Sequence, residues 1–214
     1  MSSYRVPYQE AESEFTEKRS RFIGHVWRVE DEAEAKARIE ETKKQYHDAR
    51  HNCWCYLLPG EVRYSDDGEP QGTAGQPMLN VFQRREVVHA CCVVTRYFGG
   101  VLLGAGGLAR AYGKAAKDAL DAAGTAVVTR WTLWDVPCTY PLLERLKQEV
   151  SAVAGRVEGA EYGAEITLRA AFPEDEEHPD GGAARFAARL RELSGGTLSM
   201  VPAGEAYLPG EREP

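Results

Sequence analysis

The sequence VVTRYFGGVLLGAGGLARAYGKAAKDAL, residues 93–120, joins an apolar segment to an alanine-rich segment through a glycine-rich loop. Residues 87–98 are almost continuously apolar, which predicts a buried central strand. Apolar side chains recur at helical spacing over residues 107–123, which predicts a helix with one face in the core. Glycine permits close backbone approach, so the loop suits a strand-to-helix corner. Its glycines are Gly99, Gly100, Gly104, Gly106 and Gly107.

The segments before this loop complete an α/β domain, which we place at residues 1–130. Alternating side chains predict a strand over residues 20–29, and strong helix formers predict a helix over residues 30–49. A hairpin follows around Pro59 and Gly60.

Two stretches of this domain lack such patterns. We expect the first fourteen residues to be loosely ordered. Residues 65–79 are rich in Asp, Gly and Pro, which predicts a long exposed loop that opens into a short helix at about residue 77.

The sequence of residues 131–214 predicts a second domain with the element order βαββαβ, which is a ferredoxin-like α+β arrangement. Charge changes at the same boundary. Residues 1–130 hold 18 Lys+Arg and 18 Asp+Glu, a net charge of 0, whereas residues 131–214 hold 8 and 15, a net charge of −7. The expected elements are residues 127–138, 139–153, 156–163, 164–172, 180–196 and 197–208.

The composition is that of a soluble globular protein, with 43% hydrophobic and 28% charged residues. No apolar run approaches the roughly 18 residues that cross a bilayer, and the polar beginning does not resemble a signal peptide. We therefore expect a cytoplasmic protein. The 5 cysteines include no Cys-x-x-Cys pair, which favours buried reduced thiols over a disulfide framework or a zinc ribbon.

Basic side chains gather on the helix after the glycine loop. Arg110, Lys114 and Lys117 recur at helical spacing on the face away from the apolar one. The first acid of this helix is Asp118, although the helix dipole favours acids in the first turn. Amides and cations at a helix start bind phosphates, and Arg96 before the loop adds a guanidinium fork. The alternative is that the glycines serve packing and the cations serve solubility.

A second polar loop, SDDGEPQGTAG, contains several candidate ligands. Asp66, Asp67 and Glu69 offer hard oxygens to Mg²⁺ or Ca²⁺, and His51 would extend them to a transition-metal set. Thr73 lies in the same loop. Asp-Gly is also a common turn dipeptide, so a structural turn is the other interpretation.

Signatures of cofactor binding and of nucleophilic catalysis are weak. The segment from Gly104 to Ala109 fits G-x-G-x-x-A, but Gly104 lies six residues beyond Phe98 and no acid ends a following strand. The sequence contains no G-x-S-x-G elbow and no recognisable Cys/His signature. We therefore expect no cofactor, and the pattern favours a binding protein over an enzyme.

Four blocks resemble the signature blocks of the YigZ/IMPACT family in order and separation: KRSRFIG, DARHNCWCYLL, SDDGEPQGTAGQPML and VVTRYFGGVLLGAGGLARAYGKA. The resemblance spans about residues 15–125. Residues 135–205 are similar to the small C-terminal domain of bacterial members, which is itself similar to a C-terminal domain of elongation factor G. Val101 and Leu102 stand where many members carry isoleucine and lysine, which removes one cation from the loop.

This resemblance implies an N-terminal fold like domain two of ribosomal protein S-five, an α/β sandwich. It also implies a role linked to translation, without a settled activity for bacterial members. The blocks shared by the family fall at Asp66, Asp67, Gly68, Glu69, Pro70, Gly72, Thr73, Gly75, Arg96, Tyr97, Phe98, Gly99, Gly100, Gly104, Gly106, Gly107 and Arg110.

We therefore expect the two polar loops to form one surface for RNA or the ribosome. The acidic second domain is expected to contact a protein partner instead. Two other classes stay open: a small-molecule enzyme that holds a phosphorylated ligand on the glycine loop, and a protein-only adaptor. The cations expected on the surface are Arg96, Arg110, Lys114 and Lys117.

Overall fold

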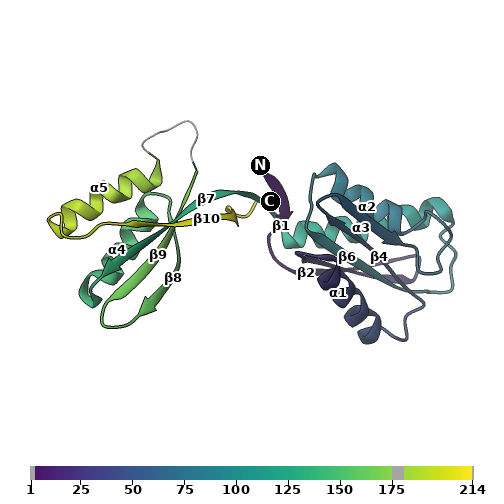
Figure 1. Cartoon of the computed structure of the whole chain (residues 1–214). Helices are drawn as coiled ribbons and strands as arrows, with labels where there is room; N and C mark the ends of the chain where they lie inside the picture. Colours follow the sequence, from purple (N-terminus) through teal and green to yellow (C-terminus); the bar gives the residue numbers. More distant parts are fainter. Residues whose placement is uncertain (1–2, 175–180, 214) are drawn as a thin grey trace. The chain divides into compact units, whose positions relative to one another are not determined.

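The computed structural model describes residues 3–174 and 181–213, and the chain forms two compact units. The N-terminal unit holds residues 3–128 and the end of the chain from Pro209, and the C-terminal unit spans residues 129–208. Both units mix helices and strands, so the predicted mixed α/β class is confirmed (Figure 1). Among the described residues, no helix is long and apolar enough to cross a membrane.

The N-terminal unit is built on a five-stranded sheet. Its strands are β2 (Ala11–Glu17), β3 (Ser20–Arg28), β4 (His51–Leu58), β5 (Glu61–Ser65) and β6 (Ala90–Tyr97). They lie in the order β2-β3-β6-β4-β5, and neighbouring strands are antiparallel. β6 is therefore central, and all of it except Tyr97 is buried, as its apolar sequence predicted.

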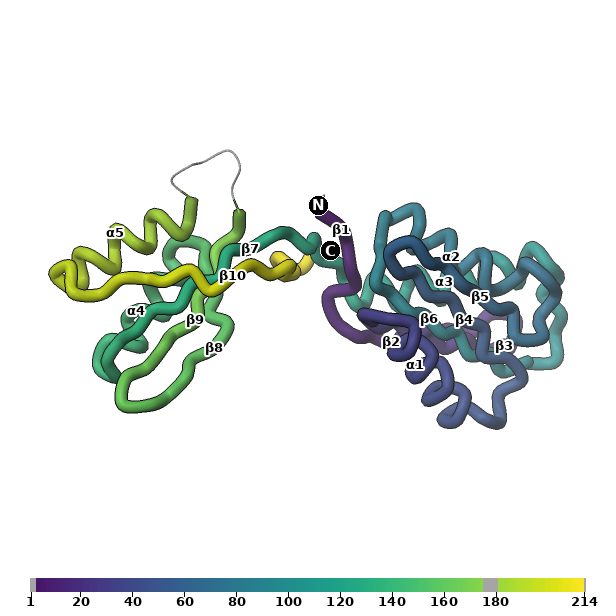
Figure 2. Tube along the Cα trace, in the orientation of Figure 1, coloured from purple at the N-terminus to yellow at the C-terminus, as the bar shows by residue number. Residues whose placement is uncertain are grey.

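Helices cover both faces of this sheet, as the chain trace shows (Figure 2). α1 (Glu32–Gln45) packs on one face, whereas α2 (Gly75–Arg84) and α3 (Ala105–Ala123) pack on the other. The predicted apolar face of α3 is buried at Leu108, Tyr112, Ala115, Ala119 and Ala123.

The beginning of the chain forms two strands, which corrects the expectation of loosely ordered residues. β1 (Tyr4–Pro7) pairs with the start of β7 (Thr125–Cys138), and β2 pairs with β3 along its whole length. Side chains alternate in β2, with Phe15 packed against the core and Glu14 exposed. The outward positions of this edge strand are polar and mostly acidic. The sequence of β2 therefore lacks the apolar character that identifies a strand.

The C-terminal unit has the element order βαββαβ. After β7 come α4 (Tyr140–Ala152), β8 (Arg156–Tyr162), β9 (Ile166–Pro173), α5 (Gly182–Ser194) and β10 (Val201–Pro209). β7 pairs with β9 and β10, and β9 pairs with β8. The core contains Phe172 and Phe186, whose ring centroids lie 5.3 Å apart. The helix was predicted from residue 180, which lies outside the described residues.

All 5 cysteines are buried free thiols, as predicted. Burial raises the pKa of Cys53, Cys91 and Cys92, because the thiolate is disfavoured away from water. We expect a thiol reagent at neutral pH to leave the folded protein unlabelled and to label every cysteine in denaturant. Mass spectrometry counts the labels, and rapid labelling of the folded protein would contradict this placement.

Candidate functional site

The glycine loop, residues 98–104, connects β6 to α3 and packs against the turn between β2 and β3. A Cβ atom at Gly99 would lie 1.9 Å from the carbonyl oxygen of Arg19, so only glycine fits there. The Gly99 N–H donates to Ser20 Oγ at 3.3 Å. The loop is thereby held against the turn that carries Lys18 and Arg19.

Replacing Gly99 by alanine is expected to lower the free energy of unfolding of the N-terminal unit by about 2 kcal/mol, a typical cost of overpacking. Urea unfolding followed by thiol labelling measures this loss. Gly113→Ala is the matched control, because its Cβ would lie 3.7 Å from the nearest atom, the carbonyl oxygen of Pro77. If Gly99→Ala behaved like Gly113→Ala, the close packing of loop and turn would be wrong.

The start of α3 favours anions. The helix begins at Ala105, not at the predicted residue 107, so Gly106 and Gly107 belong to its first turn. Gly104 is the N-cap with a φ of +72°, and Gly100 in the loop has a φ of +84°, values that favour glycine. Among the described residues no side chain caps this helix, and its first turn contains no acid. The first-turn amides therefore have no acceptor within the helix, at the positive end of its dipole.

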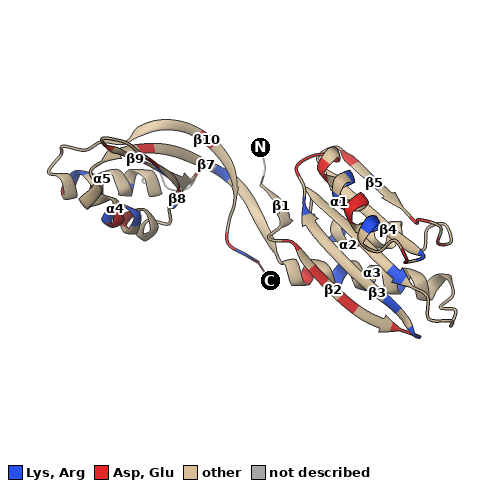
Figure 3. Ribbon diagram, turned by 90° about the horizontal axis from the view of Figure 1, so that it is seen from below, with Lys and Arg blue, Asp and Glu red and all other residues tan. Residues whose placement is uncertain are grey.

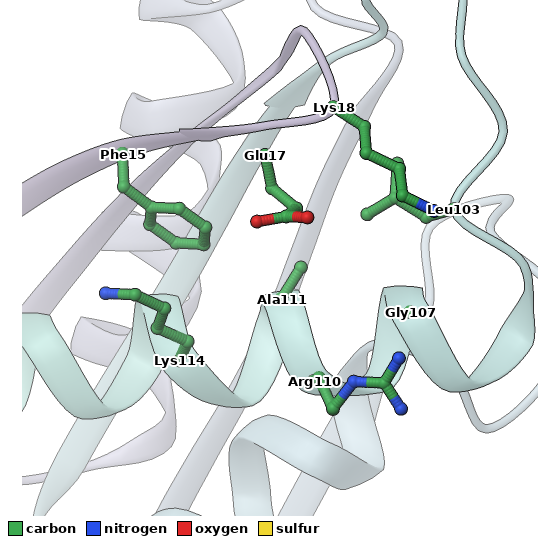
Figure 4. Close-up of a pocket in the computed structure, with 8 residues that line it drawn as sticks. All are labelled: Phe15, Glu17, Lys18, Leu103, Gly107, Arg110, Ala111 and Lys114. Carbon is green, nitrogen blue, oxygen red and sulfur yellow. The ribbon is translucent and has the colours of Figure 1, made fainter.

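A basic pocket of about 170 Å³ lies beside the first turns of α3 (Figure 4). Lys18 reaches from the β2–β3 turn toward Leu103, while Arg110 and Lys114 extend from α3. Of the residues that line this pocket, Glu17 is the one acid, against three cations. The pocket is therefore suited to an anionic group.

Acids elsewhere on β2 do not line this pocket. Red segments along β2 mark its acids (Figure 3). Glu12 and Glu14 are exposed, at positions that alternate with Phe15, which packs against the core. Glu14 accepts two hydrogen bonds from the Arg21 guanidinium, at 2.8 and 2.7 Å. These acids thus lie on the other face of the strand from the basic pocket.

The predicted basic stripe on α3 is partly neutralised by acids one turn later. Lys114 pairs with Asp118, and Lys117 Nζ lies 2.6 Å from Asp121 Oδ2. Arg110 forms no ion pair with any residue that the structure describes. Both lysine side chains are more than half exposed, and such surface pairs contribute about 1 kcal/mol or less, so a phosphate can replace the acid.

The Arg96 guanidinium is not exposed, although the sequence predicted that it would be available to bind a phosphate. Its side chain is 6% exposed, and Nη1 donates to Glu69 Oε1 at 2.6 Å. The Tyr112 hydroxyl donates to the same oxygen at 2.8 Å, and burial raises the pKa of Tyr112, which keeps the phenol neutral. Arg96 and Glu69 therefore form a buried ion pair that joins the end of β6 to the SDDGEP loop.

Asp66 organises the backbone of the SDDGEP loop. Its carboxylate accepts three backbone N–H groups, from Gly72 at 2.7 Å, Ala74 at 3.0 Å and Gly75 at 2.9 Å. Gly75 is the first residue of α2, which begins two residues before the predicted start at residue 77. Asp66 thus holds the start of that helix as a capping residue does.

The other candidate ligands of this loop are also engaged. Asp67 Oδ2 accepts the backbone N–H of Asn52 at 2.7 Å, and Thr73 Oγ1 donates to the Pro70 carbonyl at 2.6 Å. Residues 70–72 of the loop are exposed, as expected, whereas Glu69 and Thr73 on either side of them are buried. These contacts support the structural interpretation of the acids. Within the described part of the chain, no cluster of three His, Cys, Asp or Glu side chains is placed to hold a metal ion.

The two polar loops meet at a second pocket of about 380 Å³. Leu103 of the glycine loop lines both this pocket and the basic pocket. The other residues that line this second pocket include Arg50, His51, Glu69, Arg96, Phe98 and Leu102. We call it the interloop pocket.

His51, which the sequence associated with the SDDGEP loop as a candidate ligand, lies beside that loop and lines the interloop pocket. Its Nδ1 lies 2.8 Å from the carbonyl oxygen of Asp67, which only accepts, so we assign the proton to Nδ1. When the ring carries this one proton, Nε2 is an acceptor; it lies 3.9 Å from Glu69 Oε1. The pairing of β4 with β6 places His51 opposite Arg96, a register that no local motif encodes.

The chain is similar to known proteins. Residues 18–120 match the family model described as the Impact N-terminal domain. The chain is similar to "IMPACT family member YvyE" of Bacillus subtilis, at 34% identity over 212 residues that cover 97% of this chain and 94% of the relative. It is also similar to "IMPACT family member YigZ" of Escherichia coli, at 35% identity over 86% of this chain and 90% of the relative. A crystal structure described as "an hypothetical protein" has a TM-score of 0.58 and 33% identity, and the match covers 94% of this chain and 97% of that chain.

Proposed function

Because the chain belongs to the IMPACT family, as its sequence blocks indicated, we propose that it is a translation-linked cytoplasmic protein that binds RNA or the ribosome and catalyses no reaction. The N-terminal unit supplies the binding surface. The observation that carries this proposal is the basic pocket, where Lys18, Arg110 and Lys114 lie beside a helix start without acids. Phosphate groups are bound by such helix starts and by clustered cations.

The proposed binding is local and electrostatic. Residues 1–130 have a net charge of 0, so attraction depends on the cluster and not on the charge of the whole unit. Arg110 is available without breaking an ion pair to a described residue, and Lys114 exchanges Asp118 for a phosphate. We therefore expect affinity to fall with salt, because bound phosphates release counterions.

The fold relationships follow the same proposal. We infer that the N-terminal unit is related to domain two of ribosomal protein S-five, and that the C-terminal unit is related to a C-terminal domain of elongation factor G. The βαββαβ order of the C-terminal unit supports the second relationship. Superposition of each unit on those domains tests both.

The C-terminal unit is proposed to contact a protein. Residues 131–214 carry a net charge of −7, which repels phosphate and suits a basic protein surface.

Co-sedimentation with ribosomes at about 50 and 200 mM salt tests the proposed function. Binding at the lower salt that declines steeply at the higher salt supports it. Binding that is insensitive to salt and survives nuclease would instead indicate a protein-only adaptor. Absence of binding at either salt would overturn the proposal.

A further inference from the structure

The interloop pocket differs in character from the basic pocket. Its volume of about 380 Å³ lies in the range of small-molecule sites, roughly 300–1,000 Å³. Phe98 and Leu102 on its lining are 41% and 81% exposed, which makes its mouth apolar. Glu69 and Arg96 on the same lining are buried. Apolar walls with a few fixed polar groups are typical of a small-ligand site.

One end of the interloop pocket is suited to a phosphate. Gly104 and Ala105 line it, so the first turn of α3 borders this space. That helix end has no side-chain cap among the described residues. Exposed Arg50 also lines this pocket and adds a positive charge. An anionic group placed here receives backbone N–H donors and the favourable end of the dipole.

Arg96 supplies an independent indication of a ligand in the same pocket. It lines the pocket with a side chain that is 6% exposed. Within the described residues, its Nε is one of two buried side-chain polar atoms without a hydrogen-bond partner. A buried charged group with an unpaired donor is unfavourable, and a negative charge placed in this pocket would stabilise the Arg96 guanidinium.

Two further side chains on the pocket lining, Phe98 and His51, could contact a planar ring and a hydroxyl group of a ligand. The Phe98 ring centroid lies 5.4 Å from Arg96 Cζ, and the ring remains exposed enough to stack with a planar group. His51 Nε2 is an acceptor for a hydroxyl donor, because Nδ1 donates to the backbone of Asp67.

We propose that the interloop pocket binds a nucleoside monophosphate. The phosphate lies on the first-turn amides of α3, near the positive charges of Arg96 and Arg50, the base stacks on Phe98, and a ribose hydroxyl donates to His51 Nε2. The same chemistry occurs in a free nucleotide and at the 5′-phosphorylated end of an RNA. This site goes beyond the proposed RNA surface, because Arg110 and Lys114 do not line it.

Isothermal titration calorimetry of the full chain with AMP, adenosine and inorganic phosphate tests the proposal. AMP is expected to bind at least tenfold more tightly than adenosine or inorganic phosphate. Phe98→Ala is expected to weaken AMP about tenfold, as loss of base stacking does, and to leave inorganic phosphate unchanged. A short RNA with and without a 5′-phosphate distinguishes the two sources of the ligand.

Ala105→Glu is the most direct variant. It places a carboxylate beside the phosphate position, yet acids in a first turn stabilise helices, so the protein should remain folded. We expect AMP affinity to fall at least tenfold in Ala105→Glu and to be unchanged in Ala122→Glu, the same substitution near the end of α3. The Lys114→Glu variant should bind AMP normally, because Lys114 lies beyond the first turn of α3 and does not line the interloop pocket, which separates this site from the RNA surface. The proposal would be overturned if AMP did not bind at millimolar concentration, or if Ala105→Glu and Ala122→Glu lost AMP affinity equally.

Discussion

Replacing Glu69 by alanine is expected to lower the free energy of unfolding of the N-terminal unit by about 3–5 kcal/mol. The substitution leaves the buried Arg96 guanidinium without its carboxylate partner, and the Tyr112 hydroxyl without its acceptor. Urea unfolding measures the loss when thiol labelling is the reporter, because four of the 5 cysteines lie in this unit.

Two variants separate the charge effect from the loss of packing. Glu69→Gln keeps an acceptor oxygen, so its loss should be smaller than that of Glu69→Ala. The double variant Glu69→Leu/Arg96→Met removes both charges and should also be more stable than Glu69→Ala, because no buried charge is left unpaired. A Glu69→Ala protein within about 1 kcal/mol of the unmodified chain would contradict the buried ion pair.

Reversing the charge of Arg110 and Lys114 is expected to lower the affinity for single-stranded RNA about tenfold or more. Two exposed ion pairs of about 0.7 kcal/mol each together correspond to a factor of ten. Fluorescence anisotropy with a labelled oligonucleotide measures the change. The variant should fold, because both side chains are exposed and neither packs in the buried core.

The matched control places the same charge change on α1. Lys36→Glu/Lys44→Glu alters net charge equally, but α1 packs on the other face of the sheet from α3. RNA affinity in this control should remain close to that of the unmodified chain. Equal losses in the two double variants would show that net charge alone governs binding.

Local sequence patterns predicted the elements that carry a strong apolar signal. The continuous run of β6 and the helical spacing of α3 identified a central strand and a half-buried helix, and both are confirmed. β2 was not predicted, because its outward residues are acidic and its inward face holds one large apolar side chain, Phe15. Pairing with β3 supplies the stabilisation that the β2 sequence alone does not reveal.

The candidate site was predicted in part. The sequence identified the two polar loops and the cations on α3, because glycine, acids and helical spacing are local signals. The partner of Arg96 was not predictable, since Glu69 lies 27 residues away and the contact depends on the strand order of the sheet. The sequence associated His51 with the SDDGEP loop, but its position opposite Arg96 depends on the register of β4 against β6.

The salt dependence of RNA binding tests the central claim most directly. Each phosphate contact contributes about 0.7 to the slope of log affinity against log salt for single-stranded nucleic acid. The Arg110→Glu/Lys114→Glu variant is therefore predicted to reduce that slope by about 1.4, while the α1 control leaves it unchanged. A variant with the slope of the unmodified chain would contradict a phosphate-binding surface at the start of α3.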